Sequence, residues 1–145
     1  MPINSRNKGA QAERECAKIW FDLTGIKLER NLDQWRSGGY DLEGLDGWAI
    51  EVKRAKKPLL NQWWQQTCEQ AAKNQLKPVL WYRLDNQKWR VVVPSHVLNP
   101  DFTLEEGLEY TCEMSPECFA MVWRELRLPD VGLAKVGLEQ WAVSC

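Results

Sequence analysis

Residues 40–53 read Tyr-Asp-Leu-Glu-Gly-Leu-Asp-Gly-Trp-Ala-Ile-Glu-Val-Lys. The Asp-Gly pair at 46–47 separates two short β-prone runs, which is the sequence mark of a β-hairpin. Polar side chains interrupt both runs: Asp41 lies in the first, and Glu51 and Lys53 lie in the second. Because side chains alternate along a strand, Glu51 must point away from the face of its two apolar neighbours. A purely structural strand would gain nothing from an acid and a base at these positions.

The length of the hairpin loop decides whether these three side chains can act together. A two-residue loop would place Asp41 and Glu51 on opposite faces of the hairpin. A three-residue loop over 45–47 pairs the two acids, because a shift of one residue turns every side chain to the other face. A type I turn followed by a left-handed glycine is a favoured form of this loop, and Gly47 suits that position. We therefore predict that Asp41, Glu51 and Lys53 share one face.

Two neighbouring carboxylates and a lysine indicate a definite chemistry. Carboxylate oxygens are the ligands of Mg²⁺, which keeps several waters and often completes its shell with substrate phosphate. We expect Asp41 and Glu51 to hold Mg²⁺, with Mn²⁺ able to substitute. Lys53 beside them would orient an attacking water or stabilise charge in the transition state. The reaction class that follows is phosphodiester hydrolysis.

The pattern Asp41, nine residues, then Glu51-Val52-Lys53 resembles the active-site signature of the PD-(D/E)xK nuclease superfamily. Residues 8–15, Lys-Gly-Ala-Gln-Ala-Glu-Arg-Glu, resemble the first-helix motif of the archaeal-type and phage Holliday junction resolvases within it. The resemblance covers roughly the first two thirds of the chain. Tyr40 replaces the usual proline before the aspartate, and the loop over 36–39 is shorter than in typical resolvases.

This resemblance implies further site residues and a substrate. Glu13 would join the catalytic site and the metal, although its place on the edge of a helix face is by itself typical of a solvated charge. Gln66, on a later helix, would assist the site. The implied activity is that of a Mg²⁺-dependent endodeoxyribonuclease that cuts branched DNA, acting as a symmetric homodimer on the two equivalent strands of a four-way junction.

Other interpretations of the same residues remain open. A nuclease of this superfamily could instead cut flaps, ends or ordinary duplex DNA in repair or restriction. A DNA-binding module could keep the fold without the chemistry, although the intact Asp41, Glu51 and Lys53 argue against such decay. A protein-interaction domain built on exposed tryptophans is a third possibility, since the chain has nine tryptophans.

The order of predicted elements indicates an α/β fold. Apolar periodicity and turn signals predict helices over 5–24 and 59–75 and strands over 26–30, 40–53 (the hairpin), 79–83 and 89–93. This α-β-β-β-α-β-β order predicts a restriction-endonuclease-like core, with a central mixed β-sheet flanked by helices. We assign residues 1–98 to the nuclease core. Residues 99–145 form a C-terminal extension packed on the same domain, with a strand over 111–114, a helix over 116–127 and an open role in dimerisation.

The charges are unevenly distributed along a chain whose formal net charge is only −1. Residues 61–99 carry 5 basic and 2 acidic side chains, whereas residues 100–145 carry 3 and 9. A basic nuclease face and an acidic tail would reconcile a neutral protein with a polyanionic substrate. The predicted DNA-binding residues are Arg6, Lys8, Arg14, Arg36, Ser37, Arg54, Lys56 and Lys57, each of which has solvation or a simple connector as its structural alternative.

The remaining composition is that of an ordinary soluble protein. No run is long and apolar enough to span a bilayer, and residues 1–6 have no secretory apolar region, so we expect no membrane partner. Five cysteines without a Cys-x-x-Cys pair predict reduced thiols in the cytoplasm of a prokaryotic or phage-infected cell. His96, the only histidine, has no His or Cys neighbours at metal-ligand spacing, so we do not expect it to bind a metal.

Overall fold

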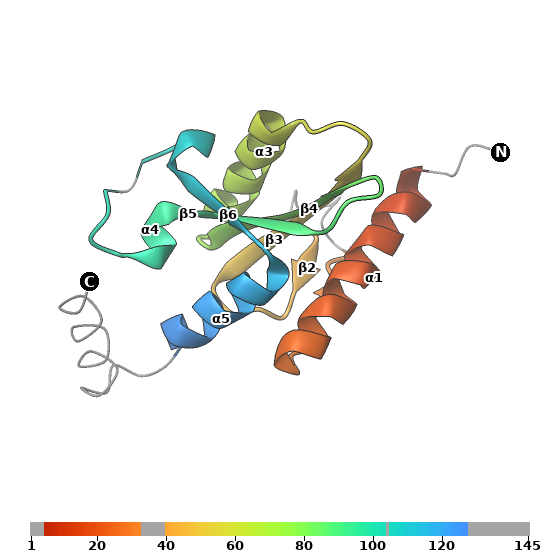
Figure 1. The fold of residues 1–145 in the computed structure, drawn as a ribbon, viewed down its shortest axis with the longest axis horizontal. Helices are drawn as coiled ribbons and strands as arrows, with labels where there is room; N and C mark the ends of the chain where they lie inside the picture. Colours follow the sequence, from red (N-terminus) through yellow and green to blue (C-terminus); the bar gives the residue numbers. More distant parts are fainter. Residues whose placement is uncertain (1–4, 33–39, 104, 128–145) are drawn as a thin grey trace.

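A computed structural model describes residues 5–32, 40–103 and 105–127 (Figure 1). Within these residues the predicted helices and strands follow one another in the predicted order, and two short helices over 95–98 and 108–110 are additions that the sequence analysis did not predict. In chain order they are α1 (Ser5–Thr24), β1 (Glu29–Arg30), β2 (Leu42–Glu43), β3 (Trp48–Ala55), α3 (Leu60–Lys73), β4 (Lys77–Leu84), β5 (Arg90–Pro94), α4 (Ser95–Leu98), the 3-10 helix η1 (Leu108–Tyr110), β6 (Thr111–Met114) and α5 (Pro116–Arg127). No helix among the described residues has both the length and the apolar character needed to cross a membrane.

The six strands of the described chain form one sheet in sequence order, from β1 to β6. All neighbouring pairs are antiparallel except β3 and β4, which are parallel. Parallel neighbours require a crossover connection, and α3 supplies it. The predicted mixed sheet flanked by helices is therefore confirmed.

The first strand is much shorter than the predicted span of 26–30. Its partner β2 has only two residues, so the ladder is limited to Glu29 opposite Glu43 and Arg30 opposite Leu42. The chain then turns at Gly44, whose φ is +117° and where an added Cβ would lie 2.8 Å from the carbonyl oxygen of Lys27. Because the chain turns at this point, β2 does not continue alongside residues 26–28, and these residues have no strand with which to pair.

Other boundaries shift by a few residues. Helix α1 ends at Thr24 as predicted, and Gly25 follows with a φ of +74°. Helix α3 ends at Lys73, two residues before the predicted end, because Gln75 adopts a positive φ of 55°. In α5, the backbone N–H of Cys118 donates to the Ser115 hydroxyl at 3.1 Å, which is the capping that the sequence indicates.

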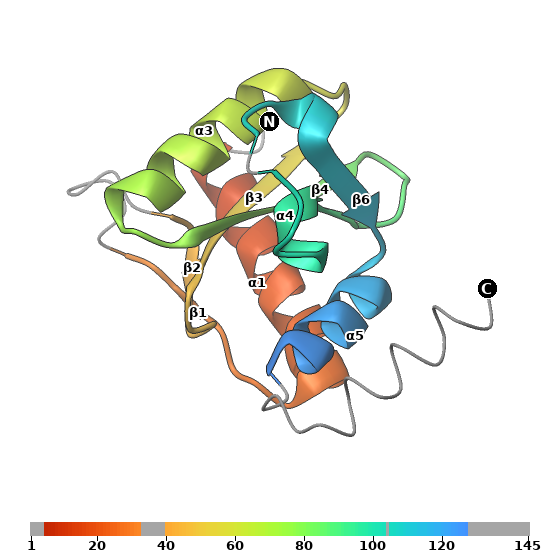
Figure 2. The same ribbon diagram turned by 90° about the vertical axis from the view of Figure 1, so that its left-hand side faces the viewer.

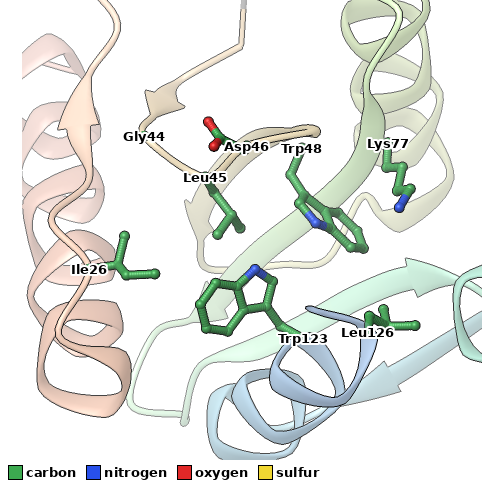
Figure 3. A pocket seen from close by; sticks show the side chains of 8 residues that line it. All are labelled: Ile26, Gly44, Leu45, Asp46, Trp48, Lys77, Trp123 and Leu126. Carbon is green, nitrogen blue, oxygen red and sulfur yellow. The ribbon is translucent and has the colours of Figure 1, made fainter. Parts of the chain in front are cut away.

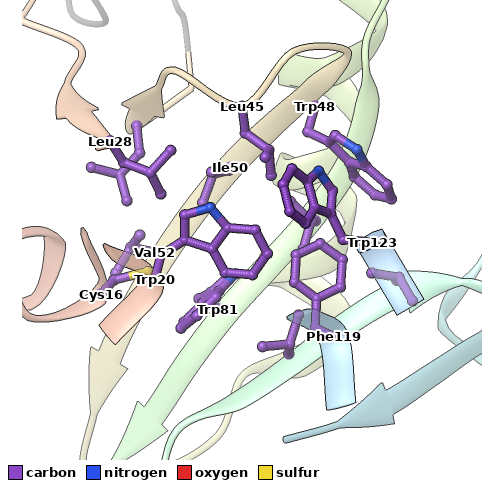
Figure 4. Close-up of a cluster of buried hydrophobic side chains, with 14 of the residues drawn as sticks. Cys16, Trp20, Leu28, Leu45, Trp48, Ile50, Val52, Trp81, Phe119 and Trp123 are labelled. Carbon is purple, nitrogen blue, oxygen red and sulfur yellow. The ribbon is translucent and has the colours of Figure 1, made fainter. Parts of the chain in front are cut away.

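Hydrophobic clusters cover both faces of the sheet. Helices α1 and α5 cover one face, where a cluster of aromatic side chains forms the larger core (Figures 2 and 4). Trp20 lies at its centre, with ring centroids 5.3 Å from Phe119, 5.3 Å from Trp123 and 6.1 Å from Trp81. Helix α3 covers the other face, where the buried residues are Trp63, Trp64, Leu80, Tyr82 and Val92. Much of the tryptophan in this chain is thus core, Trp123 included; Trp141 lies outside the described residues.

Candidate active site

The β2–β3 hairpin brings the two predicted acids together. Leu42 pairs with Ile50, and both are buried on the α1 side of the sheet. Continued by one residue, this register sets Asp41 opposite Glu51, on the other side. The register that follows from a three-residue loop over 45–47 is therefore confirmed, and Gly47 has the expected positive φ, of 86°.

Backbone hydrogen bonds hold Asp41 at the end of β2. Its N–H donates to the carbonyl oxygen of Ile50 at 2.8 Å, and its carbonyl oxygen accepts from the N–H of Asn31 at 2.9 Å. The Asn31 side-chain amide also donates to the carbonyl oxygen of Tyr40 at 3.0 Å. The Asp41 side chain continues the ladder, because its Oδ2 accepts the backbone N–H of Val52 at 2.7 Å. The carboxylate is thus oriented by the strand that carries Glu51.

Glu51 is 3% exposed in the middle of β3. Its Oε1 lies 3.5 Å from the Nζ of Lys53, the next residue on the same face. Its Oε2 is buried and has no hydrogen-bond partner. Burying a carboxylate oxygen without a hydrogen-bond donor costs free energy. A cation or a proton bound at this atom would offset that cost.

The pKa values of Asp41 and Glu51 also indicate a position that favours a cation or a proton. Burial, and then the negative charge of Glu51, raise the pKa of Asp41 to about 8, although the Val52 N–H opposes the shift. Burial also raises the pKa of Glu51, and the positive charge of nearby Lys53 opposes this shift. The raised pKa values mean that the two buried acids bind protons more tightly than ordinary carboxyls do, and a divalent cation beside them would favour their charged forms instead.

Glu13 approaches this pair from α1. It is only 6% exposed, so the solvated position that its place in the helix suggests is wrong. Its negative charge contributes to the raised pKa of both Asp41 and Glu51. Its Oε2 lies 2.5 Å from the Nε of Arg30 in β1, in a partly buried ion pair. The sequence reasoning missed Arg30, for which the only signal was a basic residue at the end of a predicted strand.

The structure describes the positions of most of the other predicted site residues, and the rest lie outside the described part of the chain. Gln66 is half-buried on α3, the helix over the face of Glu51 and Lys53, and no contact joins it to the acids. Among the predicted DNA-binding residues, Lys8 and Arg14 lie on α1, and Arg54, Lys56 and Lys57 lie at the end of β3 or just after it. Arg36, Ser37 and the side chain of Arg6 lie outside the described residues.

A second set of contacts joins α1 to β4 and to Trp89. The sequence reasoning missed these contacts too. Glu15 Oε1 accepts hydrogen bonds from Arg83 Nη1 at 3.0 Å and from Trp89 Nε1 at 2.9 Å. The Arg83 guanidinium lies over the Trp89 ring, 5.9 Å from its centroid. A charged residue near the end of the buried run 79–83 was the available signal.

A pocket of about 210 Å³ lies away from the acids, at the N-terminal ends of β3 and β4 (Figure 3). Its walls include Trp48 and Lys77 from the starts of these strands and Trp123 from α5. Neither Asp41 nor Glu51 lines it.

The comparisons with known proteins identify the family. The family model described as "Phage putative PDDEXK endonuclease" matches residues 4–105. The chain belongs to this family. The matched residues include the whole hairpin and the glutamate of α1, so the resemblance to PD-(D/E)xK nucleases is confirmed.

Comparison with solved structures gives a more distant neighbour. Hjc, a Holliday junction resolvase from the archaeal hyperthermophile Archaeoglobus fulgidus, is 19% identical and aligns with a TM-score of 0.48. The alignment covers 80% of this chain and 98% of that one. No curated protein matches the chain.

The residues present fit a divalent cation of the kind this endonuclease family is expected to use. Two carboxylates with raised pKa values and one oxygen without a donor would suit an ion that keeps several waters. Within the described part of the chain, no group of three acids, histidines or cysteines converges closely enough to enclose a metal. In the structure Glu13 is paired with Arg30.

Proposed function

We propose that this protein is a Mg²⁺-dependent endodeoxyribonuclease that hydrolyses phosphodiester bonds in branched DNA. The observation that supports this most is the buried pair of Asp41 and Glu51, with the Glu51 Oε2 lacking a donor and Lys53 3.5 Å from Oε1. Two neighbouring buried acids cost free energy in the metal-free protein, and the same arrangement becomes favourable when a cation binds.

Each residue has a defined part in this proposal. Asp41 and Glu51 hold Mg²⁺, and Glu13 acts as a further acid on the metal side of the site. Bound Mg²⁺ supplies a Lewis acid and lowers the pKa of water. Lys53 orients the attacking water and stabilises negative charge that develops on the phosphate. Gln66 assists from α3.

The DNA is proposed to pass over the end of β3. Lys56 and Lys57 are exposed directly after this strand, and Lys8 and Arg14 extend the basic surface along α1. Arg6, Arg36, Ser37 and Arg54 complete the proposed set. These contacts to the phosphate backbone position the duplex without reading its sequence.

Branched DNA is the proposed substrate because of the motif on α1. Its Glu13, the residue that the resolvase resemblance singles out, is buried beside the acid pair. A four-way junction has two equivalent strands to cut, so a twofold symmetric homodimer is proposed as the working form. Flap, end and ordinary duplex DNA are the competing substrates.

Cleavage of a labelled four-way junction beside linear duplex, flap and single-stranded DNA tests the proposal. Reactions contain Mg²⁺, Mn²⁺ or EDTA, with wild type, Asp41→Asn and Asp46→Asn. Asp46 is an exposed acid in the turn of the same hairpin and serves as the matched control. We expect paired, metal-dependent nicks in the junction from wild type and Asp46→Asn only.

The other outcomes separate the parts of the proposal. Cleavage of flaps or duplex in preference to the junction would keep the nuclease and reject the resolvase. A folded wild-type protein that binds DNA but cuts no substrate with either metal would favour a DNA-binding module.

A further inference from the structure

Two arginines lie side by side at the C-terminal ends of β3 and β4. Arg54 and Arg83 are directly paired in the parallel register of these strands. Both alternate with residues of the α3 face, Lys53 and Tyr82, so they lie on the face that α1 covers. Like charges on adjacent strands destabilise a sheet.

Their partners do not balance their charges. Arg83 is paired with Glu15 and stacks on Trp89. Arg54 has no hydrogen bond or ion pair to any of the described residues. The Nε atoms of both arginines are buried and lack a hydrogen-bond acceptor. Of the two guanidinium groups, only that of Arg83 thus has a carboxylate partner among the described residues, and buried donors without an acceptor are costly.

We infer that Arg54 and Arg83 form a binding site for a phosphate group of the DNA, distinct from the position of the cleaved phosphate. The guanidinium fork matches the oxygens of a phosphate, and a tetrahedral anion can accept from two such forks. Arg54 directly follows Lys53, so this phosphate lies across the end of the strand from the acid pair. The inference rests on the proposed function, which supplies the DNA.

Asp85 offers the alternative partner. It follows β4 two residues after Arg83, and its Oδ1 is buried without a hydrogen-bond partner. No ion pair joins it to either arginine. If Asp85 is the true partner of Arg54, the arginine has a structural role and its loss lowers stability.

The test compares Arg54→Gln with Lys73→Gln, each in the Asp41→Asn background with EDTA so that DNA stays intact. Lys73 is an exposed lysine in the last turn of α3 and belongs to none of the proposed DNA contacts. Affinity for a labelled four-way junction is measured over a series of salt concentrations. We expect Arg54→Gln to weaken binding roughly tenfold and to reduce the salt slope by about 1. Lys73→Gln should weaken binding less than about twofold.

Thermal unfolding of the same proteins, with and without inorganic phosphate, provides a readout that needs no DNA. Phosphate should raise the Tm of the parent and of Lys73→Gln, but not that of Arg54→Gln. Without phosphate, Arg54→Gln should unfold at the parent temperature or above it, because a buried Nε–H that lacks an acceptor among the described residues has been removed.

An Arg54→Gln protein that binds DNA as Lys73→Gln does, or that unfolds at a clearly lower temperature without phosphate, would overturn the inference. Failure of the proposed function would appear differently. In that case the wild type would not cut DNA in Mg²⁺, while the phosphate-dependent Tm shift would still report on the arginine pair.

Discussion

The Oδ2 of Asp41 accepts a hydrogen bond of 2.7 Å from the backbone N–H of Val52. Strand β2 begins only at Leu42, after Asp41, so the Asp41 side chain rather than a strand carbonyl oxygen accepts this N–H of the ladder. Val52 lies between Glu51 and Lys53, and one hydrogen bond therefore fixes the first acid relative to the other two side chains. Asp41 has a structural contact as well as a proposed catalytic one.

Replacing Asp41 should separate these two contributions. Asparagine keeps an oxygen for the Val52 N–H but loses the negative charge, so Asp41→Asn should fold and bind DNA while cleavage falls by about 10³ or more. Asp41→Ala should also lose about 1–3 kcal/mol of stability, because the buried N–H is left without an acceptor. Junction cleavage and urea unfolding measure the two effects. Cleavage by Asp41→Asn within tenfold of wild type would contradict the assignment.

The raised pKa of Asp41 predicts how stability depends on pH in the metal-free protein. Its folded pKa of about 8 lies above the ordinary value of 3.8, so the folded state binds the proton more tightly. The resulting stabilisation is complete below about pH 4 and is lost as pH rises through about 8. The raised pKa of Glu51 acts in the same direction.

In EDTA, the free energy of unfolding should therefore fall between pH 5 and 8, by up to about 1.4 kcal/mol per pH unit for each protonated carboxyl. Asp41→Asn should show a flatter profile over this range. Urea titrations at a series of pH values give both curves. A wild-type stability that rises towards pH 8, with the variant parallel to it, would show that the pair does not retain a proton.

The ion pair of Glu13 and Arg30 should be important for stability. Glu13 is buried and Arg30 is its cation, so Arg30→Gln would leave a buried charge unpaired and cost about 2–4 kcal/mol. Lys27→Gln is the control, because the ion pair of Lys27 with Glu29 is exposed and should change stability by less than about 0.5 kcal/mol. Chemical denaturation compares them, and equal effects would mean that burial does not strengthen the Glu13 pair.

Adjacent residues of α1 test the aromatic core. Trp20 is fully buried, whereas Phe21 is 52% exposed. Trp20→Ala should cost about 3–5 kcal/mol, because three aromatic rings lose their central partner and a cavity remains. Phe21→Ala should cost less than about 1 kcal/mol. Urea midpoints provide the comparison, and a large effect at Phe21 would instead indicate that this residue is covered in solution by another copy of the chain.

The sequence was most informative where a local pattern had only one physically acceptable outcome. The hairpin register followed from the Asp-Gly turn and the alternation of buried side chains, and both are properties of the nearest neighbours. The crossover helix α3 and the capping of α5 by Ser115 were similarly local.

The missed features depend on contacts between distant parts of the chain. Arg30 meets Glu13 across 17 residues, and Arg83 meets Glu15 across 68. Neither periodicity nor turn chemistry specifies which charged residues from distant parts of the chain form ion pairs. The shortness of β1 has the same origin, because it depends on where the partner strand turns away at Gly44.

The pairing of Leu42 with Ile50 has a consequence for folding, because it makes misfolded registers of the hairpin unstable. Leu42 is completely buried, and the same register that buries it sets Asp41 against Glu51. A slip of one residue would expose Leu42 to water, at about 1.5–3 kcal/mol, while it separated the acids. The burial of Leu42 therefore penalises a register that separates the acids, and the free energy of folding itself selects the arrangement of the site.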